Sequence, residues 1–182
     1  QYIADGIRIK SAEAYAMYAG IVIDTNNFTN QTGVRTFEAA AFLRRNGADV
    51  VRVRKLFRDD LDDYKAKAEA VREAEIFEGC FAISTCPSEG IESPTVVGAQ
   101  AANELLDIAG MKASIVMTFY NNTIYLSARS IDEVNVQVMM EKLGGGGHRT
   151  IAGAQLKDMS LEEARNRVKE VIRDMLEKGD IS

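Results

Sequence analysis

The spacing of apolar positions separates an N-terminal part, where helices are predicted, from a C-terminal part in which strands and helices alternate. Apolar residues occupy nearly every side of segment 12–23, which predicts a buried helix with Ser11 as its N-cap. A second helix is predicted over 37–46, with Thr36 at its start and Gly47 in the left-handed position that often follows a helix. Two helices are therefore expected before residue 50.

A strongly charged helix is predicted between Asp59 and Phe77. Its apolar residues recur at spacings of three and four and form one narrow stripe, which consists of Leu61, Tyr64, Ala68 and Val71. A helix this charged in the middle of a chain suits a connector between two packed bodies. We therefore predict a boundary near residue 65, with domains at 1–64 and 65–182.

The remaining residues predict a compact α/β unit. Strands are predicted at 80–86, 113–120 and 123–130, and the Asn121-Asn122 link suits the positive φ of a tight hairpin. Helices are predicted over 94–107, with Pro94 at the first position, from Asp132 onward, and over 161–178. The helix after Asp132 has Val136, Met139, Met140 and Leu143 on its inner side, and it leads into a run of four glycines.

The glycine run 144–147 is the strongest candidate for a ligand site. Four glycines can turn successive backbone N–H groups toward one point, and such a concavity suits a phosphate. His148, the single histidine of the chain, follows directly. A flexible hinge is the alternative, but Leu143 and Ile151 flank the run, whereas linkers usually lie among Ser, Pro or charged residues.

A second group of donors lies on the predicted strand 123–130. Ser127 and Arg129 are two residues apart, so they lie on the same face of that strand. Arginine can bind a phosphate through two parallel N–H groups, although a weak surface salt bridge is the common alternative. We expect Arg129 and the glycine run to meet at one edge of the sheet. The run is not a P-loop, because no Lys follows it, and a helix precedes it instead of the strand of a dinucleotide fingerprint.

Asp24 ends the first predicted helix, where its charge faces the negative end of the helix dipole. A metal ion would compensate that placement. An Asx-turn, in which the carboxylate caps its own backbone, is an equally good explanation.

The composition limits the range of functions. A net charge of −5 argues against general electrostatic capture of nucleic acid. No apolar run approaches the ~18 residues of a membrane helix. Cys80 and Cys86 would lie about 20 Å apart along a strand, too far for a disulfide, and free thiols indicate a reducing cytoplasm. The chain starts without Met, so we expect a fragment of a longer protein.

These motifs resemble a known family. Gly144–His148 after a short amphipathic helix, with Ser127–Ser130 upstream, resembles the DHH-associated C-terminal domain of the DHH phosphoesterases. Segments 19–28 and 33–40 resemble the last motif of the catalytic DHH domain of that family. The resemblance implies an α/β chain in which a C-terminal remnant of the DHH domain is joined by a helix to a small substrate-binding domain.

Segments 42–49 and 53–61 are most similar to the membrane-anchored cyclic-di-AMP phosphodiesterases within that family. The resemblance implies a hydrolase with two manganese ions that converts cyclic-di-AMP to linear 5′-pApA. It implies a cytoplasmic location, with the parent protein attached to the cell membrane. It also implies that Asp24 is a catalytic metal ligand, and that the substrate is bound by Gly144, Gly145, Gly146, Gly147, His148, Ser127, Arg129 and, as a weaker candidate, Arg35.

The chain contains no Asp-His-His motif, and family members take most metal ligands from segments upstream of Asp24. We therefore expect the fragment alone to be inactive and to depend on the upstream metal-binding segment of its parent. Two alternatives stay open. One is a nanoRNase of the same family that acts on short linear oligonucleotides, and the other is a non-catalytic nucleotide-binding module.

Overall fold

The computed structural model describes residues 9–29, 32–131 and 133–179, and the chain divides into two compact units, Gln1–Asp59 and Asp60–Ser182. The division falls a few residues before the boundary predicted near residue 65. The helix that was predicted as a connector, α4 (Leu61–Arg72), therefore lies wholly within the second unit. None of the helices in the described ranges combines the length and apolar character needed to cross a bilayer.

Within its described residues the first unit contains three helices, α1 (Ser11–Asp24), α2 (Val34–Arg45) and α3 (Val50–Leu56). Their small core includes Ala14, Tyr18, Leu43 and Val53. Gly47 has φ of +99° directly after the C-cap of α2, which confirms the predicted helix end.

The prediction of a fully buried α1 is wrong. Only Ala14, Tyr18 and Ala19 of this helix are buried, whereas Met17 and Ile23 are 44% and 64% exposed. The apolar residues surround the helix, but α2 and α3 cover only one side of it within this unit. The N-cap is Lys10, so Ser11 is already helical.

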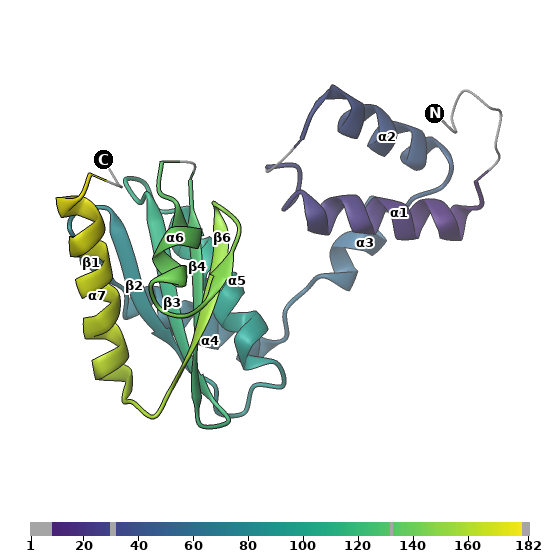
Figure 1. Ribbon diagram of the computed structural model, residues 1–182. Helices are drawn as coiled ribbons and strands as arrows, with labels where there is room; N and C mark the ends of the chain where they lie inside the picture. The colour runs from purple at the N-terminus through teal and green to yellow at the C-terminus, as the bar shows by residue number, and fades with distance from the viewer. Residues whose placement is uncertain (1–8, 30–31, 132, 180–182) are drawn as a thin grey trace. The chain divides into compact units, whose positions relative to one another are not determined.

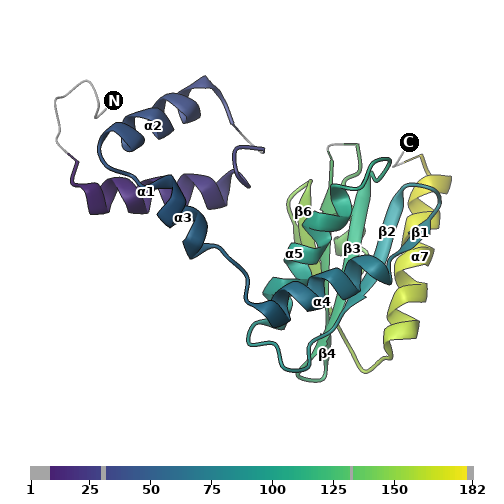
Figure 2. The same ribbon diagram turned by 180° about the vertical axis from the view of Figure 1, so that it is seen from behind.

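The second unit is a six-stranded sheet with helices on both faces (Figures 1 and 2). The described strands run in the order β1-β2-β3-β4-β6-β5, in which β2 and β3 pair in parallel and the other neighbours pair antiparallel. Helix α5 (Pro94–Leu106) connects that parallel pair. The other elements are β1 (Glu75–Phe77), β2 (Phe81–Cys86), β3 (Ala113–Tyr120), β4 (Thr123–Ser130), α6 (Val136–Glu141), β5 (Gly146–Gly147), β6 (Ile151–Lys157) and α7 (Leu161–Glu177).

The two faces of the sheet bury different residues. Alternate positions such as Ile115, Met117, Leu126 and Ala152 pack with α6 and α7 in one cluster. On the opposite face α4 and α5 form a second cluster with β2 and β3. The α/β fold predicted from the sequence is confirmed, as are the bounds of β3 and β4 and the positive φ of Asn121 and Asn122 between them.

Helix α4 packs through a side that matches the predicted stripe only at Val71, which packs against the second cluster. Leu61 and Tyr64 of the expected stripe are 67% and 62% exposed. Ala66 and Ala70 are buried instead, because their small side chains let α4 approach α5 and β2 closely, and Lys67 beside them is buried as well. The Lys67 ammonium lies 2.9 Å from a Glu104 carboxylate oxygen of α5.

Helix α6 begins with Asn135 as its N-cap, three residues later than expected, and the Asp132 assigned to that role lies outside the described residues. Val136, Met139, Met140 and Leu143 are buried as predicted. Cys80 and Cys86 are both free, which confirms the prediction, and burial raises the pKa of the Cys86 thiol to about 11.

The glycine run ends α6 and forms the short edge strand β5 against β6. A Cβ on Gly145 would lie 2.1 Å from the Gly153 carbonyl oxygen, and one on Gly147 would lie 2.5 Å from the Ala152 Cα. A Cβ on Gly146 would meet no atom within 4 Å. The run is therefore no flexible hinge: Gly145 and Gly147 permit a close approach between backbones, while Gly146 faces open space.

This difference gives a matched pair of substitutions. We expect Gly145→Ala to lower the free energy of unfolding by about 1–3 kcal/mol, because the added methyl overlaps the backbone of β6. Gly146→Ala should change it by no more than about 0.5 kcal/mol, as for other uncrowded surface positions. Urea denaturation of the two variants measures both values, and equal losses would contradict the packing described here.

Candidate functional site

The register of the sheet brings Arg129 and His148 to one face. Arg129 of β4 lies opposite Ser114 of β3 on one side and opposite Ile151 of β6 on the other. His148 and Ile151 exchange both backbone hydrogen bonds, at 2.7 and 3.3 Å, so they close the β5–β6 hairpin as an opposed pair. Directly opposed residues point to the same face. The Cα atoms of Arg129 and His148 are therefore about 10 Å apart, with Ile151 between them, because each opposed pair contributes roughly 5 Å.

Ser127 and Gly146 belong to the same face. Ser127 lies opposite Gly153, and Gly153 lies opposite Gly146. We call this surface the open face; its residues are Ser127, Arg129, Gly146, His148, Ile151 and Gly153.

The part of the open face on β6 and β5 is accessible to solvent, because α5 packs over β3 and β4. Exposed and buried residues alternate along β6: Ile151 is 47% exposed, whereas Ala152, Ala154 and Leu156 are buried in the cluster that includes α6 and α7. Figure 2 shows α4 and α5 on the side of the sheet to which the open face belongs. A ligand could therefore lie beside α5 over β4, β6 and β5.

Arg129 is half-buried and held by two neutral oxygens. Its Nε donates to Asn103 Oδ1 at 2.9 Å, and its Nη1 donates to the Ala128 carbonyl oxygen at 2.9 Å. The backbone N–H of Ser130 donates to Thr150 O of the segment that leads into β6. Backbone groups of alternate residues in a strand point to the same neighbouring strand, so the Ala128 carbonyl also points toward β6. The guanidinium therefore lies on the β6 side of β4, the side on which the glycine strand is found.

The charge of Arg129 has no carboxylate partner within the described chain. Burial lowers the pKa of this guanidinium, because a partly desolvated cation is less stable than one in water. Two of its five N–H groups are engaged, which leaves three for a ligand. The surface salt bridge considered as an alternative for Arg129 is absent from the described residues.

The glycine amides do not form the converging cradle expected from four glycines. Gly144 N donates to Glu141 O at 3.0 Å, Gly145 N to Met140 O at 2.8 Å, and His148 N to Ile151 O at 2.7 Å. The first two bonds satisfy carbonyls at the end of α6. Because His148 and Ile151 form a hydrogen-bonded pair, the Gly147 N–H points away from β6, toward the outer edge of the sheet. Gly147 is the amide of this run that is best placed for a ligand.

Asp24 and Arg35 belong to the first unit. Asp24 is exposed at the end of α1, and Arg35 is exposed in the first turn of α2. The turn after Asp24 is closed by Thr25, which donates to Ile21 O at 2.6 Å and accepts from Phe28 N at 3.0 Å. The Asx-turn considered for Asp24 is therefore replaced by a threonine turn.

The segment after Asp24 has an unusual backbone. Asn26, Asn27 and Phe28 have φ of 44°, 56° and 66°, and a bulky aromatic residue rarely adopts this conformation. Contacts of the Phe28 ring with Tyr18 and Phe37, at centroid distances of 6.1 and 5.4 Å, hold it there. Among the described residues no three His, Cys, Asp or Glu side chains are grouped as a metal site, so Asp24 has no complete ligand set.

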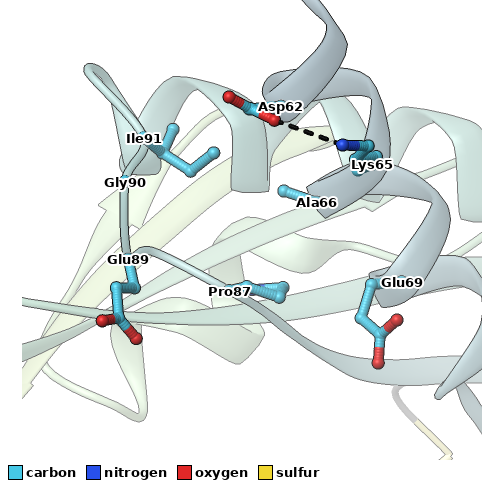
Figure 3. A pocket seen from close by; sticks show the side chains of 8 residues that line it. All are labelled: Asp62, Lys65, Ala66, Glu69, Pro87, Glu89, Gly90 and Ile91. Carbon is cyan, nitrogen blue, oxygen red and sulfur yellow. Dashed lines mark ion pairs between the residues drawn. The ribbon is translucent and has the colours of Figure 1, made fainter.

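A groove of about 460 Å³ lies elsewhere in the second unit, between α4 and the loop after β2 (Figure 3). It is lined by Asp62, Lys65, Ala66, Glu69, Pro87, Glu89, Gly90 and Ile91. The lining residues carry three carboxylates and one ammonium, and Lys65 already pairs with Asp62 at 3.5 Å. This acidic lining repels a phosphate, so the groove is not a candidate for the same ligand.

Asn103 is a site residue that the sequence did not indicate. It lies on α5, 26 residues from Arg129, and an Asn within a helix carries no motif. Only the packing of α5 over β3 and β4 brings the two side chains together.

Two relatives resemble this chain in sequence, and one solved structure resembles it in fold. The protein is 42% identical to cyclic-di-AMP phosphodiesterase GdpP of Geobacillus thermodenitrificans over 98% of this chain and 27% of that protein. It is 43% identical to cyclic-di-AMP phosphodiesterase PdeA of Listeria monocytogenes over 92% of this chain and 26% of that protein. The chain thus spans about a quarter of the length of these relatives. The crystal structure of an exopolyphosphatase-related protein from Bacteroides fragilis has the same fold, with a TM-score of 0.82 and 19% identity, covering 92% of this chain and 51% of that one.

The family profile described as the DHHA1 domain matches residues 80–177, which include β2 to α7 and the whole open face. This match confirms the DHH-associated domain expected from Gly144–His148 and Ser127–Ser130. The chain belongs to the DHHA1 domain family.

Proposed function

We propose that this chain supplies the substrate-binding part of a metal-dependent phosphodiesterase that hydrolyses cyclic-di-AMP to linear 5′-pApA. The observation that carries the proposal is the half-buried guanidinium of Arg129, which no carboxylate of the described chain neutralises and which lies on the same open face as His148. A desolvated cation without a partner is costly, and a bound phosphate would compensate it. The names of the two relatives support a cyclic dinucleotide as the source of that phosphate.

The residues of the open face have distinct roles in this proposal. Arg129 holds the non-bridging oxygens of a phosphate through its remaining N–H groups. His148 donates a hydrogen bond to the same phosphate or to a ribose hydroxyl, and the Gly147 N–H and the Ser127 hydroxyl add neutral donors. Gly146 and Gly153 carry no side chain, so a ribose or a base can lie directly on the sheet.

The reaction also requires metal ions, and manganese is our proposal for them. Bound metals would lower the pKa of a water molecule and stabilise the charge that develops on the phosphate. Asp24 and, more weakly, Arg35 are proposed to contribute from the first unit. The described residues give Asp24 no group of three ligating side chains. We propose that the remaining ligands come from an upstream segment of the parent protein. The parent is further proposed to act in the cytoplasm while attached to the cell membrane.

Two rival functions use the same open face. A nanoRNase would bind a short linear oligonucleotide, and a non-catalytic module would bind a nucleotide without cleaving it. A competition experiment that compares the binding of cyclic-di-AMP and linear pApA to this chain shows whether the open face prefers a cyclic or a linear ligand. Turnover of the two compounds by the full-length parent separates an enzyme from a binding module.

Binding of cyclic-di-AMP to this chain tests the open face. We expect Arg129→Ala to weaken binding about 10- to 100-fold, because charge-assisted hydrogen bonds contribute roughly 1.5–3 kcal/mol. His148→Ala should weaken it about ten-fold without loss of the folded state, since the side chain is exposed. Isothermal titration calorimetry measures both, with Arg167→Ala on the exposed side of α7 as a control that removes the same charge. Affinities like that of the control for both variants would contradict the proposal.

Hydrolysis by the chain itself is a separate test. With cyclic-di-AMP and manganese we expect no 5′-pApA above the metal-only blank, because a single carboxylate cannot hold two metal ions. Chromatography of the products measures this. Manganese-dependent product formation that Asp24→Asn abolishes would show that the chain completes its own metal site, against our expectation.

A further inference from the structure

Asn103 holds the guanidinium of Arg129 from the side of α5. Its Oδ1 accepts the Arg129 Nε–H at 2.9 Å. The turn of α5 that carries it is itself anchored, because the Ser114 hydroxyl of β3 donates to the Ala102 carbonyl oxygen at 2.6 Å. Ala102 and Ser114 are both fully buried, so this attachment is rigid. The orientation of Arg129 is thus connected through one amide to the core of the second unit.

The chemical type of residue 103 is informative. An acceptor at this position orients a guanidinium whether it is an amide or a carboxylate, but a carboxylate would also neutralise it. The chain uses the amide. The nearest carboxylate along α5, that of Glu104, pairs with the buried Lys67 at 2.9 Å instead. Arg129 is therefore fixed in direction while its charge remains uncompensated.

We propose that Asn103 is a positioning residue for phosphate recognition, which orients the Arg129 guanidinium toward the glycine strand and leaves its positive charge available to the substrate. The inference rests on the proposed function, since it names a residue of the same binding face. Asn103 acts through Arg129 and needs no contact of its own with the ligand. The Ala128 carbonyl, at 2.9 Å from Nη1, supplies the second restraint.

The decisive variant is Asn103→Asp, which keeps an acceptor for Nε and adds a negative charge. We expect cyclic-di-AMP to bind at least about ten-fold more weakly, because a carboxylate forms an ion pair with Arg129 and competes with the phosphate. The thermal unfolding temperature should be unchanged or higher. Thr95→Asp is the matched control: it adds the same charge to the same helix, eight residues or about 12 Å away along its axis, and should leave the affinity as in the wild type.

Asn103→Ala tests the orienting role separately from charge. We expect binding to weaken about three- to ten-fold, in the range of a lost neutral hydrogen bond. The Arg129 Nε–H signal in a ¹H–¹⁵N spectrum should shift and exchange faster with solvent, which reports directly that the guanidinium has lost its acceptor. In an Arg129→Ala background, Asn103→Ala should have no further effect on binding, because Asn103 acts only through that guanidinium.

Wild-type affinity in Asn103→Asp, or a full additional loss from Asn103→Ala in the Arg129→Ala background, would overturn the inference. A fall in the unfolding temperature of Asn103→Asp that accounts for its weaker binding would also overturn it. These results can be told apart from failure of the proposed function. If Arg129→Ala itself binds cyclic-di-AMP normally, the open face is not the phosphate site; if only the Asn103 variants behave like wild type, the site stands without this positioning residue.

Discussion

The register of β6 between β4 and β5 is the constraint on which the candidate site depends. A strand has a side-chain period of two, so a slip of one residue would move Ile151 and Gly153 into the core and Ala152 and Ala154 into solvent. Burial of Ala152, Ala154 and Leu156 in the cluster that includes α6 and α7 opposes that slip. The same register sets Arg129 opposite Ile151 and thereby on the face of His148. Hydrophobic burial on one side of the sheet thus determines which polar groups meet on the other.

The glycine run shows how one sequence feature serves packing and binding together. Gly145 and Gly147 are required because the backbone of β6 leaves no room for a Cβ, and three of the amides around the run are engaged within the protein. The glycine run therefore offers a ligand fewer backbone donors than a cradle of four amides would. It offers the outward Gly147 N–H and the uncovered surface at Gly146. The strongest donor of the open face is Arg129 instead, whose charge is kept uncompensated by two neutral acceptors.

The first unit shows where periodicity alone is insufficient. The apolar residues of α1 extend around the helix, and this pattern predicted burial on all sides. Within the unit, however, other elements cover only one side of the helix. In the same way, the stripe of Leu61 and Tyr64 on α4 is amphipathic by spacing, yet Ala66 and Ala70 make the contacts. Large apolar residues contribute more burial energy in isolation, but a close helix–helix and helix–sheet approach favours small ones. Spacing does not show which of these alternatives applies.

The sequence by itself determined the α/β class, the positions of β2, β3 and β4 and of the helices of the second unit, and the family motif around Gly144–His148. These follow from local chemistry: the period of apolar residues, the positive φ of Asn121 and Asn122, and glycines at a helix end. The tertiary structure decided the strand order, the face to which Arg129 points, the internal use of the glycine amides and the role of Asn103. Each of these depends on contacts between residues far apart in the chain, such as Asn103 with Arg129 or Gly145 with Gly153, and no local pattern records which distant segments will pair.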